Sequence, residues 1–475
     1  QLKDEGRIDL HVPVSDYLPW FAPPSKFGPI TIHHLLSHTA GLSSGTDFAP
    51  DPRFEVYAAR EYEPAWAPGE RFHYSNLAYK ALGLILERVS GRSYSEIIQQ
   101  RVLDPLGMSS SVAAFTNDTR PRMATGYGYL YDDRPGYPGA PLAPETWFQS
   151  NTADGCLASS VIDLATYLRM YLNRGSGSNG NRVLTEENYR LMTARVIPLD
   201  AMAEKPASFY GYGLFTRIVD GRVLVGHSGG MVGYYSDMIC DPEAGVGAVA
   251  MVNGPGDPAA FTRYALRLLQ ANALGEPLPE LPASAAAVQW DAYAGIYARP
   301  DGERGVEVSI SGEQLRLSID GLEAELMPDP HGQPDTFIVG HPELGRNLLR
   351  FKRNASGGVV EALHGNDWYV NEQYDGPRSF AYPDEWNAYP GHYRSHNPWQ
   401  ASVRVIRRKG KLWLAFPAGF ELPLRQRSEG SFVAQSSEDE DAVDLPEWAR
   451  FDTVVDGRAL RVTISGNAFY RFFTP

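Results

Sequence analysis

Apolar positions in the first part of the chain alternate between a helical and a strand-like spacing. The helical spacing predicts helices over residues 30–36, 77–89 and 164–172, and Gly41 and Gly91 stop the first two. Strand-like runs follow at residues 214–218, 222–226, 236–240 and 246–252. The last three are closely spaced and broken by Gly and Asp-Pro turns, which favours antiparallel pairing. A helix over residues 261–269 then returns over that sheet, so residues 1–280 are predicted to form one mixed α and β domain.

Residues 275–282 are rich in proline and end this domain. Proline is unfavourable both in a helix interior and in a sheet ladder, so this segment is predicted to be an extended linker.

An internal repeat follows the linker. Trp290-Asp-Ala-Tyr-Ala-Gly-Ile-Tyr297 reappears 96 residues later as Trp386-Asn-Ala-Tyr-Pro-Gly-His-Tyr393, and alternating apolar and polar positions follow each copy. Such alternation over about 90 residues closes most simply into a small antiparallel barrel, because closure leaves no open strand edge. We expect two barrels, at residues 286–378 and 383–475. The alternative is one large sandwich in which the similarity is coincidental.

The N-terminal residues 1–6 read as the last turn of a helix that Gly6 ends. One turn is not stable by itself, so we expect that the chain was cut inside a helix.

Charge and composition exclude some classes of function. The formal net charge of −14 argues against a nucleic-acid backbone or an anionic membrane surface as the main partner. No apolar run approaches the ~18 residues that a membrane helix needs. The two cysteines, Cys156 and Cys240, cannot form a disulfide framework; two buried thiols are favoured over one bridge. The compartment stays open.

Two segments carry candidate chemistry. Tyr74, Ser75 and Asn76 follow a Pro-Gly turn and precede the helix over residues 77–89, so Tyr74 is placed at the positive end of a helix dipole, which favours phenolate. Alternatively, Asn76 is a helix N-cap and Tyr74 a packed aromatic. The second segment is Val225-Gly-His-Ser-Gly-Gly-Met231, in which a strand delivers His227 and unshielded glycines offer peptide N–H groups. Alternatively, His227 is an ordinary turn residue.

Taken together, these motifs resemble those of the β-lactamase-related, penicillin-recognising serine hydrolases, and the resemblance covers nearly all of residues 1–270. In chain order the motifs are Thr31-Ile-His-His-Leu-Leu-Ser-His-Thr-Ala-Gly-Leu42, Tyr74-Ser-Asn76, Pro105-Leu-Gly-Met108, Asp154-Gly-Cys-Leu-Ala-Ser-Ser160 and His227-Ser-Gly229. The resemblance implies an α+β fold, a β-lactamase/transpeptidase-like domain of an antiparallel sheet flanked by helices, followed here by the two barrels. It also implies a serine acyl hydrolase that works through an acyl-enzyme.

By the same resemblance, Tyr74 takes and returns the proton of the nucleophilic serine, and Asn76 hydrogen-bonds the catalytic lysine and the substrate amide. His227 lines the site beside Tyr74, and the Gly229-Gly230 segment holds the oxyanion through the Gly230 N–H.

The sequence departs from the family pattern at the nucleophile. None of its seven lysines has a serine three positions earlier, so the family's Ser-x-x-Lys motif is not in this chain. In the family register, the serine is expected about a dozen residues before Gln1. Truncation of a working enzyme is favoured; the alternative is a binding protein that lacks the nucleophile.

The third motif carries His227 where classical penicillin-binding enzymes carry lysine. A largely neutral imidazole attracts a substrate carboxylate less than an ammonium does, so small peptide amides or esters without a nearby carboxylate are favoured as substrates, as in the D-aminopeptidases of the superfamily. The tandem barrels resemble those of the same D-aminopeptidases, in which a barrel loop restricts the cleft; stabilisation and homodimer contact through the barrels are the alternatives. A lipocalin-like ligand cavity is disfavoured in barrels of this size. A carboxylesterase or β-lactamase of the same superfamily remains a further alternative.

The remaining histidines carry no metal motif. His34 and His38 lie four positions apart on a helix but lack a zincin glutamate, so structural roles are expected, and His392 and His396 are placed in a barrel loop. No cofactor and no metal are expected. A periplasmic or secreted site fits the resemblance.

Overall fold

A computed structural model describes the chain except for residues 47–50, 201, 202, 204, 282–289, 303, 304, 331, 440 and 472–475. The chain divides into two compact units. One holds residues 1–128 and 143–282, and the other holds residues 129–142 and 283–475. The end of the expected linker, Pro282, and the expected start of the first barrel at residue 286 lie outside the described residues. In the described part of the chain, no helix is both long and apolar enough to cross a bilayer.

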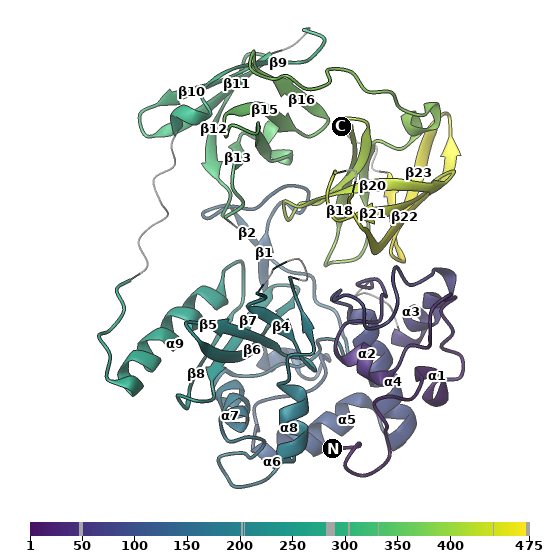
Figure 1. The fold of residues 1–475 in the computed structure, drawn as a ribbon, viewed down its shortest axis with the longest axis vertical. Helices are drawn as coiled ribbons and strands as arrows, with labels where there is room; N and C mark the ends of the chain where they lie inside the picture. Colours follow the sequence, from purple (N-terminus) through teal and green to yellow (C-terminus); the bar gives the residue numbers. More distant parts are fainter. Residues whose placement is uncertain are drawn as a thin grey trace. The chain divides into compact units, whose positions relative to one another are not determined.

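The first unit combines helices with an antiparallel sheet (Figure 1). Its helices are α1 (Val14–Tyr17), α2 (Ile32–Leu36), α3 (Pro52–Ala58), α4 (Asn76–Ser90), α5 (Tyr94–Ile98), α6 (Asp104–Leu106), α7 (Val161–Leu172), α8 (Glu186–Met192) and α9 (Pro258–Leu274). The sheet has the order β3-β4-β5-β6-β7-β8, with strands Ile197–Pro198, Ser208–Tyr210, Phe215–Val219, Arg222–Met231, Tyr234–Asp241 and Val246–Val252. This architecture confirms the predicted fold class.

A side-chain cap and a glycine set the two ends of helix α4. The Ser75 hydroxyl accepts a hydrogen bond from the Ala78 N–H at 3.1 Å, and Gly91 ends the helix in the left-handed conformation at φ 69°. Between these ends, Leu77, Ala81, Leu84 and Ile85 are buried at helical spacing in one apolar cluster, and the helix gains most of its stability from that packing.

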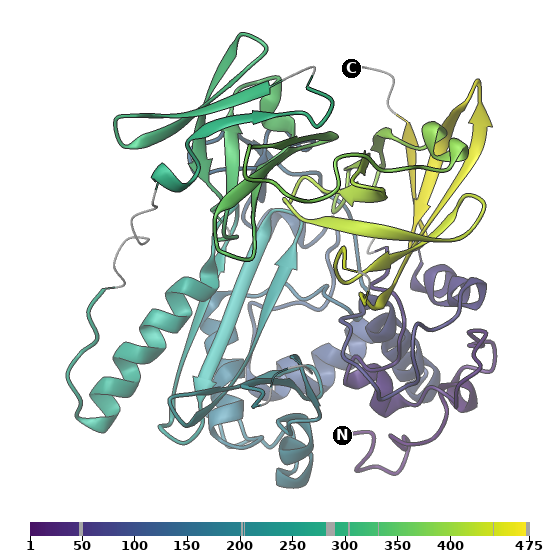
Figure 2. The same ribbon diagram turned by 45° about the horizontal axis from the view of Figure 1, so that its top comes forward.

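Helices α7 and α9 cover opposite faces of the sheet. Successive side chains of a strand point to opposite faces. On β7, Ile239 packs with Leu266 of α9, whereas Met238 and Cys240 pack in the cluster that contains Leu168 of α7. Figures 1 and 2 show α9 lying along the sheet.

Strand β6 is longer than its sequence predicts. The prediction ended it at Gly226, but the strand continues to Met231 because β7 pairs with it throughout that stretch. β5 pairs only with residues Arg222 to Gly226 of β6. In the described part of the sheet, residues 227–231 of β6 therefore pair with β7 on one edge and with no strand on the other.

Both predicted barrels are confirmed in the second unit. β9–β16 close the first barrel, with strands Gly295–Ala298, Gly305–Ser311, Gln314–Ile319, Leu322–Pro328, Thr336–Gly340, Leu349–Arg353, Val359–His364 and Asp367–Val370. β17–β24 close the second, with strands Gly391–Arg394, Ser402–Arg408, Lys411–Ala415, Glu421–Ser428, Ser431–Gln435, Asp444–Val455, Arg458–Ile464 and Asn467–Arg471. His392 therefore lies in β17 and not in a loop, because its segment pairs with β18 and β24.

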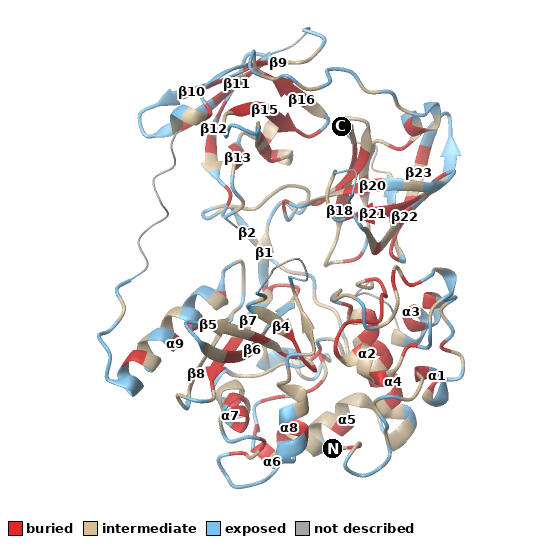
Figure 3. Ribbon diagram, in the orientation of Figure 1, coloured by how far each residue is buried: buried red, intermediate tan, exposed pale blue. Residues whose placement is uncertain are grey.

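The sequence repeat has a structural counterpart. The Tyr297 hydroxyl donates to the Tyr293 carbonyl at 2.9 Å, and the equivalent Tyr393 hydroxyl donates to the Tyr389 carbonyl at 2.7 Å. Apolar side chains fill both interiors, which Figure 3 shows as buried positions along the barrel strands. The barrels are packed cores, as expected for their size.

One loop of the first 280 residues belongs to the second unit. The short strands β1 (Tyr127–Tyr129) and β2 (Leu142–Pro144) pair with each other, and the loop between them packs with the barrels. The two cysteines are both free and buried, which confirms the favoured prediction.

Candidate functional site

Buried hydrogen bonds of Ser75 hold the Tyr74 loop in place. Ser75 donates through its backbone N–H to the His38 Nδ1 at 3.0 Å and through its hydroxyl to the Ser43 carbonyl at 2.7 Å. Because Ser75 is the N-cap of α4, Asn76 is the first helical residue, so the alternative of Asn76 as the cap is wrong. Among the described residues, the Asn76 side chain makes no hydrogen bond, so its amide is available to a ligand.

His38 has the structural role that the sequence predicts, and it acts directly on this loop. It is buried, takes the left-handed conformation at φ 54°, and packs against the Tyr74 ring with 4.3 Å between ring centroids. Tyr79 and Tyr210 also contact it, at 4.8 and 4.9 Å. Burial, followed by the charges of His227 and His73, lowers the pKa of His38 to about 3. His38 is therefore a neutral support for Tyr74.

His227 is fixed as a neutral imidazole. Its Nε2 lies 3.0 Å from the Tyr210 hydroxyl, and its Nδ1 contacts the Ser228 carbonyl. A carbonyl only accepts, so Nδ1 carries the proton and Nε2 accepts from Tyr210. The ring also stacks on Phe215 at 4.9 Å. Burial lowers the pKa of His227. The hydrogen bond to the Ser228 carbonyl raises this pKa by a smaller amount, and the charge of Arg217 lowers it slightly further.

Tyr74 and His227 lie close together although they are far apart in the sequence. Their ring centroids are 6.1 Å apart, and the Tyr74 side chain is 37% exposed, so a ligand can reach it. Ser228, Gly229 and Gly230 are exposed on the part of β6 that has a neighbouring strand on one edge only. The arrangement places a hydroxyl, an imidazole and an open backbone edge in one region, which suits acyl transfer.

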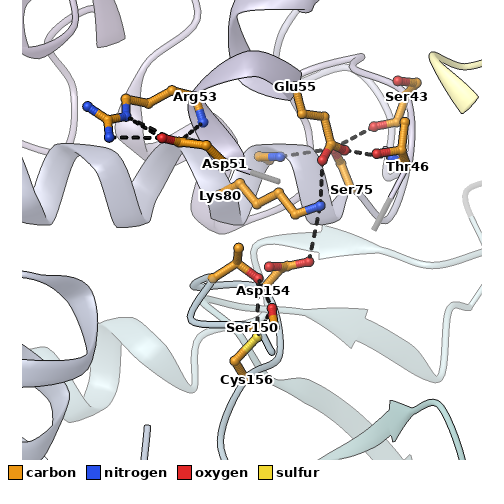
Figure 4. A network of polar contacts seen from close by, with 12 residues as sticks. Ser43, Thr46, Asp51, Arg53, Glu55, Ser75, Lys80, Ser150, Asp154 and Cys156 are labelled. Carbon is orange, nitrogen blue, oxygen red and sulfur yellow. Dashed lines mark hydrogen bonds and ion pairs between the residues drawn. The ribbon is translucent and has the colours of Figure 1, made fainter. Parts of the chain in front are cut away.

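A buried ion cluster lies one helical turn beyond Asn76 (Figure 4). The Lys80 ammonium is 2.6 Å from Glu55 of α3 and 3.5 Å from Asp154, and all three side chains are at most 10% exposed. Glu55 also accepts from the Thr46 N–H at 2.6 Å. Burial raises the pKa of Asp154, and Lys80 opposes that shift. The cluster ties the first turns of α4 to two other segments, so it supports the Tyr74 loop.

A pocket borders the open end of β6. It has a volume of about 120 Å³ and its lining includes Arg120, Glu145, Trp147, Phe148 and Met231. Arg120 lies over the Trp147 ring at 5.2 Å. This pocket could not be predicted from the sequence, because its lining residues come from three separate segments without a common motif. Its aromatic walls can hold an apolar group.

The low pKa of His38 predicts an acid-sensitive fold. The unfolded histidine takes up a proton near pH 6.5, whereas the folded one does so only near pH 3. The neutral His38 therefore contributes fully to stability above about pH 6.5, and this contribution is lost as the pH falls from 6.5 toward 3. We expect the wild-type free energy of unfolding, measured in urea, to fall between pH 7 and pH 4.5.

His38→Asn, which tolerates the left-handed backbone and does not titrate, should be less stable at pH 7 but lose less stability on acidification. His396→Asn, at an exposed position, serves as the control and should keep the wild-type slope. An unchanged slope in His38→Asn would contradict the assignment.

Comparison with known proteins places the first unit in a known group. The family model described as Beta-lactamase matches residues 1–272, a range that includes Tyr74, Asn76, His227 and Gly230. Penicillin-binding protein 4 of Amycolatopsis lactamdurans is 29% identical over 316 residues, which cover 64% of this chain and 81% of that protein. Protein flp of Staphylococcus aureus (strain NCTC 8325 / PS 47) is 27% identical over 264 residues, which cover 53% of this chain and 49% of its own length.

A solved structure extends the similarity beyond the family match. The octameric penicillin-binding protein homologue from Pyrococcus abyssi has a TM-score of 0.53 and 28% sequence identity, and the match covers 78% of this chain and 84% of that one. The similarity therefore reaches past residue 272, into the second unit.

Proposed function

This chain belongs to the Beta-lactamase family of serine acyl hydrolases, and from that premise we propose that it serves the hydrolysis of small peptide amides or esters through an acyl-enzyme. The observation that carries the proposal is the 6.1 Å separation of the Tyr74 and His227 rings, beside the exposed Gly229-Gly230 edge of β6. The nucleophilic serine and its lysine are proposed to come from residues that precede Gln1.

The proposed reaction has two matched halves. The serine oxygen attacks the substrate carbonyl while its proton passes to the Tyr74 phenolate, and the Gly230 N–H donates to the resulting oxyanion. The intermediate collapses, the bond to the amine or alkoxide breaks, and Tyr74 returns the proton to that leaving group. Water then attacks the acyl-enzyme by the same route, which releases the acid and restores the serine hydroxyl. Asn76 hydrogen-bonds the lysine and the substrate amide.

Covalent labelling tests the proposal. Protein translated from its own start codon should label with a fluorophosphonate at one serine, and the chain that begins at Gln1 should not label. The second candidate function is a binding protein without a nucleophile, and the observation that raises it is the lack of Ser-x-x-Lys in residues 1–475. Binding of cell-wall peptides by the longer protein without any labelling would establish that candidate instead.

The neutral His227 supports a substrate class without a carboxylate beside the scissile bond. We expect D-alanine p-nitroanilide or p-nitrophenyl butyrate to be cleaved in preference to a peptide that ends in D-Ala-D-Ala. In His227→Lys, the new ammonium should shift the ratio of kcat/KM values at least tenfold toward the carboxylate substrate, equivalent to about 1.4 kcal/mol. An unchanged ratio would contradict this basis for selectivity.

A comparison of the kcat/KM values for D-alanine and L-alanine p-nitroanilide tests the proposed D-stereochemistry. Restriction of the site by a barrel loop and dimer contact through the barrels stay predictions.

A further inference from the structure

A polar pocket lies within the second unit, remote in sequence from every residue of the proposed catalytic site. Its walls come from both barrels and from the loop between β1 and β2. Its volume is about 20 Å³, room for a small polar head group, and Phe420 at its border is 40% exposed. Three arginines line it: Arg346 and Arg350 of the first barrel and Arg404 of β18.

Two of these arginines have buried nitrogen atoms without a partner. The Nε atoms of Arg346 and Arg404 are inaccessible to water and make no hydrogen bond in the described part of the chain. Arg346 forms no ion pair among the described residues, and the nearest carboxylate to Arg404 is Asp133 at 3.7 Å. Atoms that water cannot reach are closed to a ligand as well, so an anion would meet the other N–H groups of these two guanidinium groups and offset their charge there.

The acidic residues at the pocket are already engaged. Glu421 lies 2.5 Å from both Arg350 and Arg408. Asp133 lies 2.8 Å from Arg134. The pocket therefore retains an excess of positive charge.

The pKa of the neighbouring His392 reflects this excess of positive charge. It shares a contact of 2.7 Å with the Ser402 hydroxyl, which also borders the pocket. Burial and then the charge of Arg404 lower the pKa of His392 to about 4, and the charges of Arg394 and Arg346 add to the effect while Asp133 opposes it. A site with this field favours an anion.

The remaining wall is apolar. Phe416 and Phe420 stack at 4.5 Å with an interplanar angle of 20°, and Leu348 lies beside them. A guanidinium fork recognises carboxylate and phosphate alike, but an aromatic wall next to it suits an anion that carries an apolar group.

We propose that this pocket between the two barrels binds an organic carboxylate that bears an apolar side chain, such as the carboxylate end of an amino acid or short peptide. Arg346 and Arg404 hold the carboxylate, and Phe416 and Phe420 contact the apolar group. Because Asp133 borders the same pocket, a bound ligand also contacts the loop between β1 and β2.

Titration calorimetry with phenylacetate on residues 1–475 tests the proposal, since all the residues that line the pocket lie within this range. We expect saturable binding, at least tenfold weaker for phenylacetamide, which lacks the charge, and for inorganic phosphate, which lacks the apolar group. Arg346→Gln and Arg404→Gln should each weaken phenylacetate binding at least tenfold, whereas Arg458→Gln, at an exposed position of β23, should not.

Arg346→Lys keeps the positive charge but not the planar guanidinium, so its loss of phenylacetate affinity should be smaller than that of Arg346→Gln. Equal binding of phenylacetamide, equal binding of phosphate, or unchanged binding in both Gln variants would each overturn the proposal. If the Gln variants fail to unfold cooperatively, the comparison of the three ligands on the wild-type protein decides it alone.

Discussion

Replacement of Tyr74 by phenylalanine should lower kcat/KM of the full-length protein by about 10²- to 10⁴-fold, the range that a general acid–base group contributes. The change removes only the hydroxyl that we propose exchanges a proton with the serine. The ring keeps its packing against His38 at 4.3 Å, so the melting temperature should change much less than kcat/KM. The measurement is steady-state hydrolysis of p-nitrophenyl butyrate, with a thermal melt of the same preparation.

Tyr57→Phe provides the matched control. Tyr57 is 52% exposed in α3, and its hydroxyl accepts from Arg60 at the surface, so its loss should leave kcat/KM within twofold of wild type. A Tyr74→Phe enzyme that retains more than a tenth of the wild-type kcat/KM would refute the role assigned to the phenol.

Replacement of Lys80 by methionine should destabilise the first unit by about 3–5 kcal/mol, the cost of removing one partner from a buried ion pair. Glu55 and Asp154 would remain buried without the ammonium that now lies 2.6 and 3.5 Å away. Urea unfolding at pH 7 measures the loss. The same substitution should also lower kcat, because the cluster supports the turn of α4 that begins at Asn76.

Lys3→Met is the control for this prediction, because Lys3 pairs with Glu187 at 2.8 Å on the surface and should lose no measurable stability. Lys80→Met combined with Glu55→Gln and Asp154→Asn should recover part of the loss, since no unpaired charge then remains buried. Unchanged stability in Lys80→Met alone would show that the buried charges are compensated in another way.

Elements with strong local signals could be predicted from the sequence. Helix α4 was found to within one residue at each end, because Ser75 caps it, Gly91 stops it and its apolar positions repeat with helical spacing. β8 was predicted with the observed bounds because its run of apolar residues is bordered by turns. The two barrels followed from the recurrence of Trp290 and Tyr297 as Trp386 and Tyr393.

Features that depend on distant partners were missed. The glycines of β6 have low strand propensity, and pairing with β7 overrides that preference as far as Met231. Lys80 reads in the sequence as a polar residue within an apolar helix, and only the fold brings Glu55 and Asp154 to it. The hydrogen bond between Tyr210 and His227 likewise has no local signal, because two different strands supply its partners.

The proposed function requires an ester between a serine and the acyl group of the substrate. Intact-mass spectrometry of the full-length protein, quenched by acid during turnover of p-nitrophenyl butyrate, detects that ester directly. We expect one added butyryl group on wild-type protein and much slower accumulation on Tyr74→Phe. Steady turnover with no adduct at any quench time, or an adduct on a residue other than a serine, would contradict the central claim.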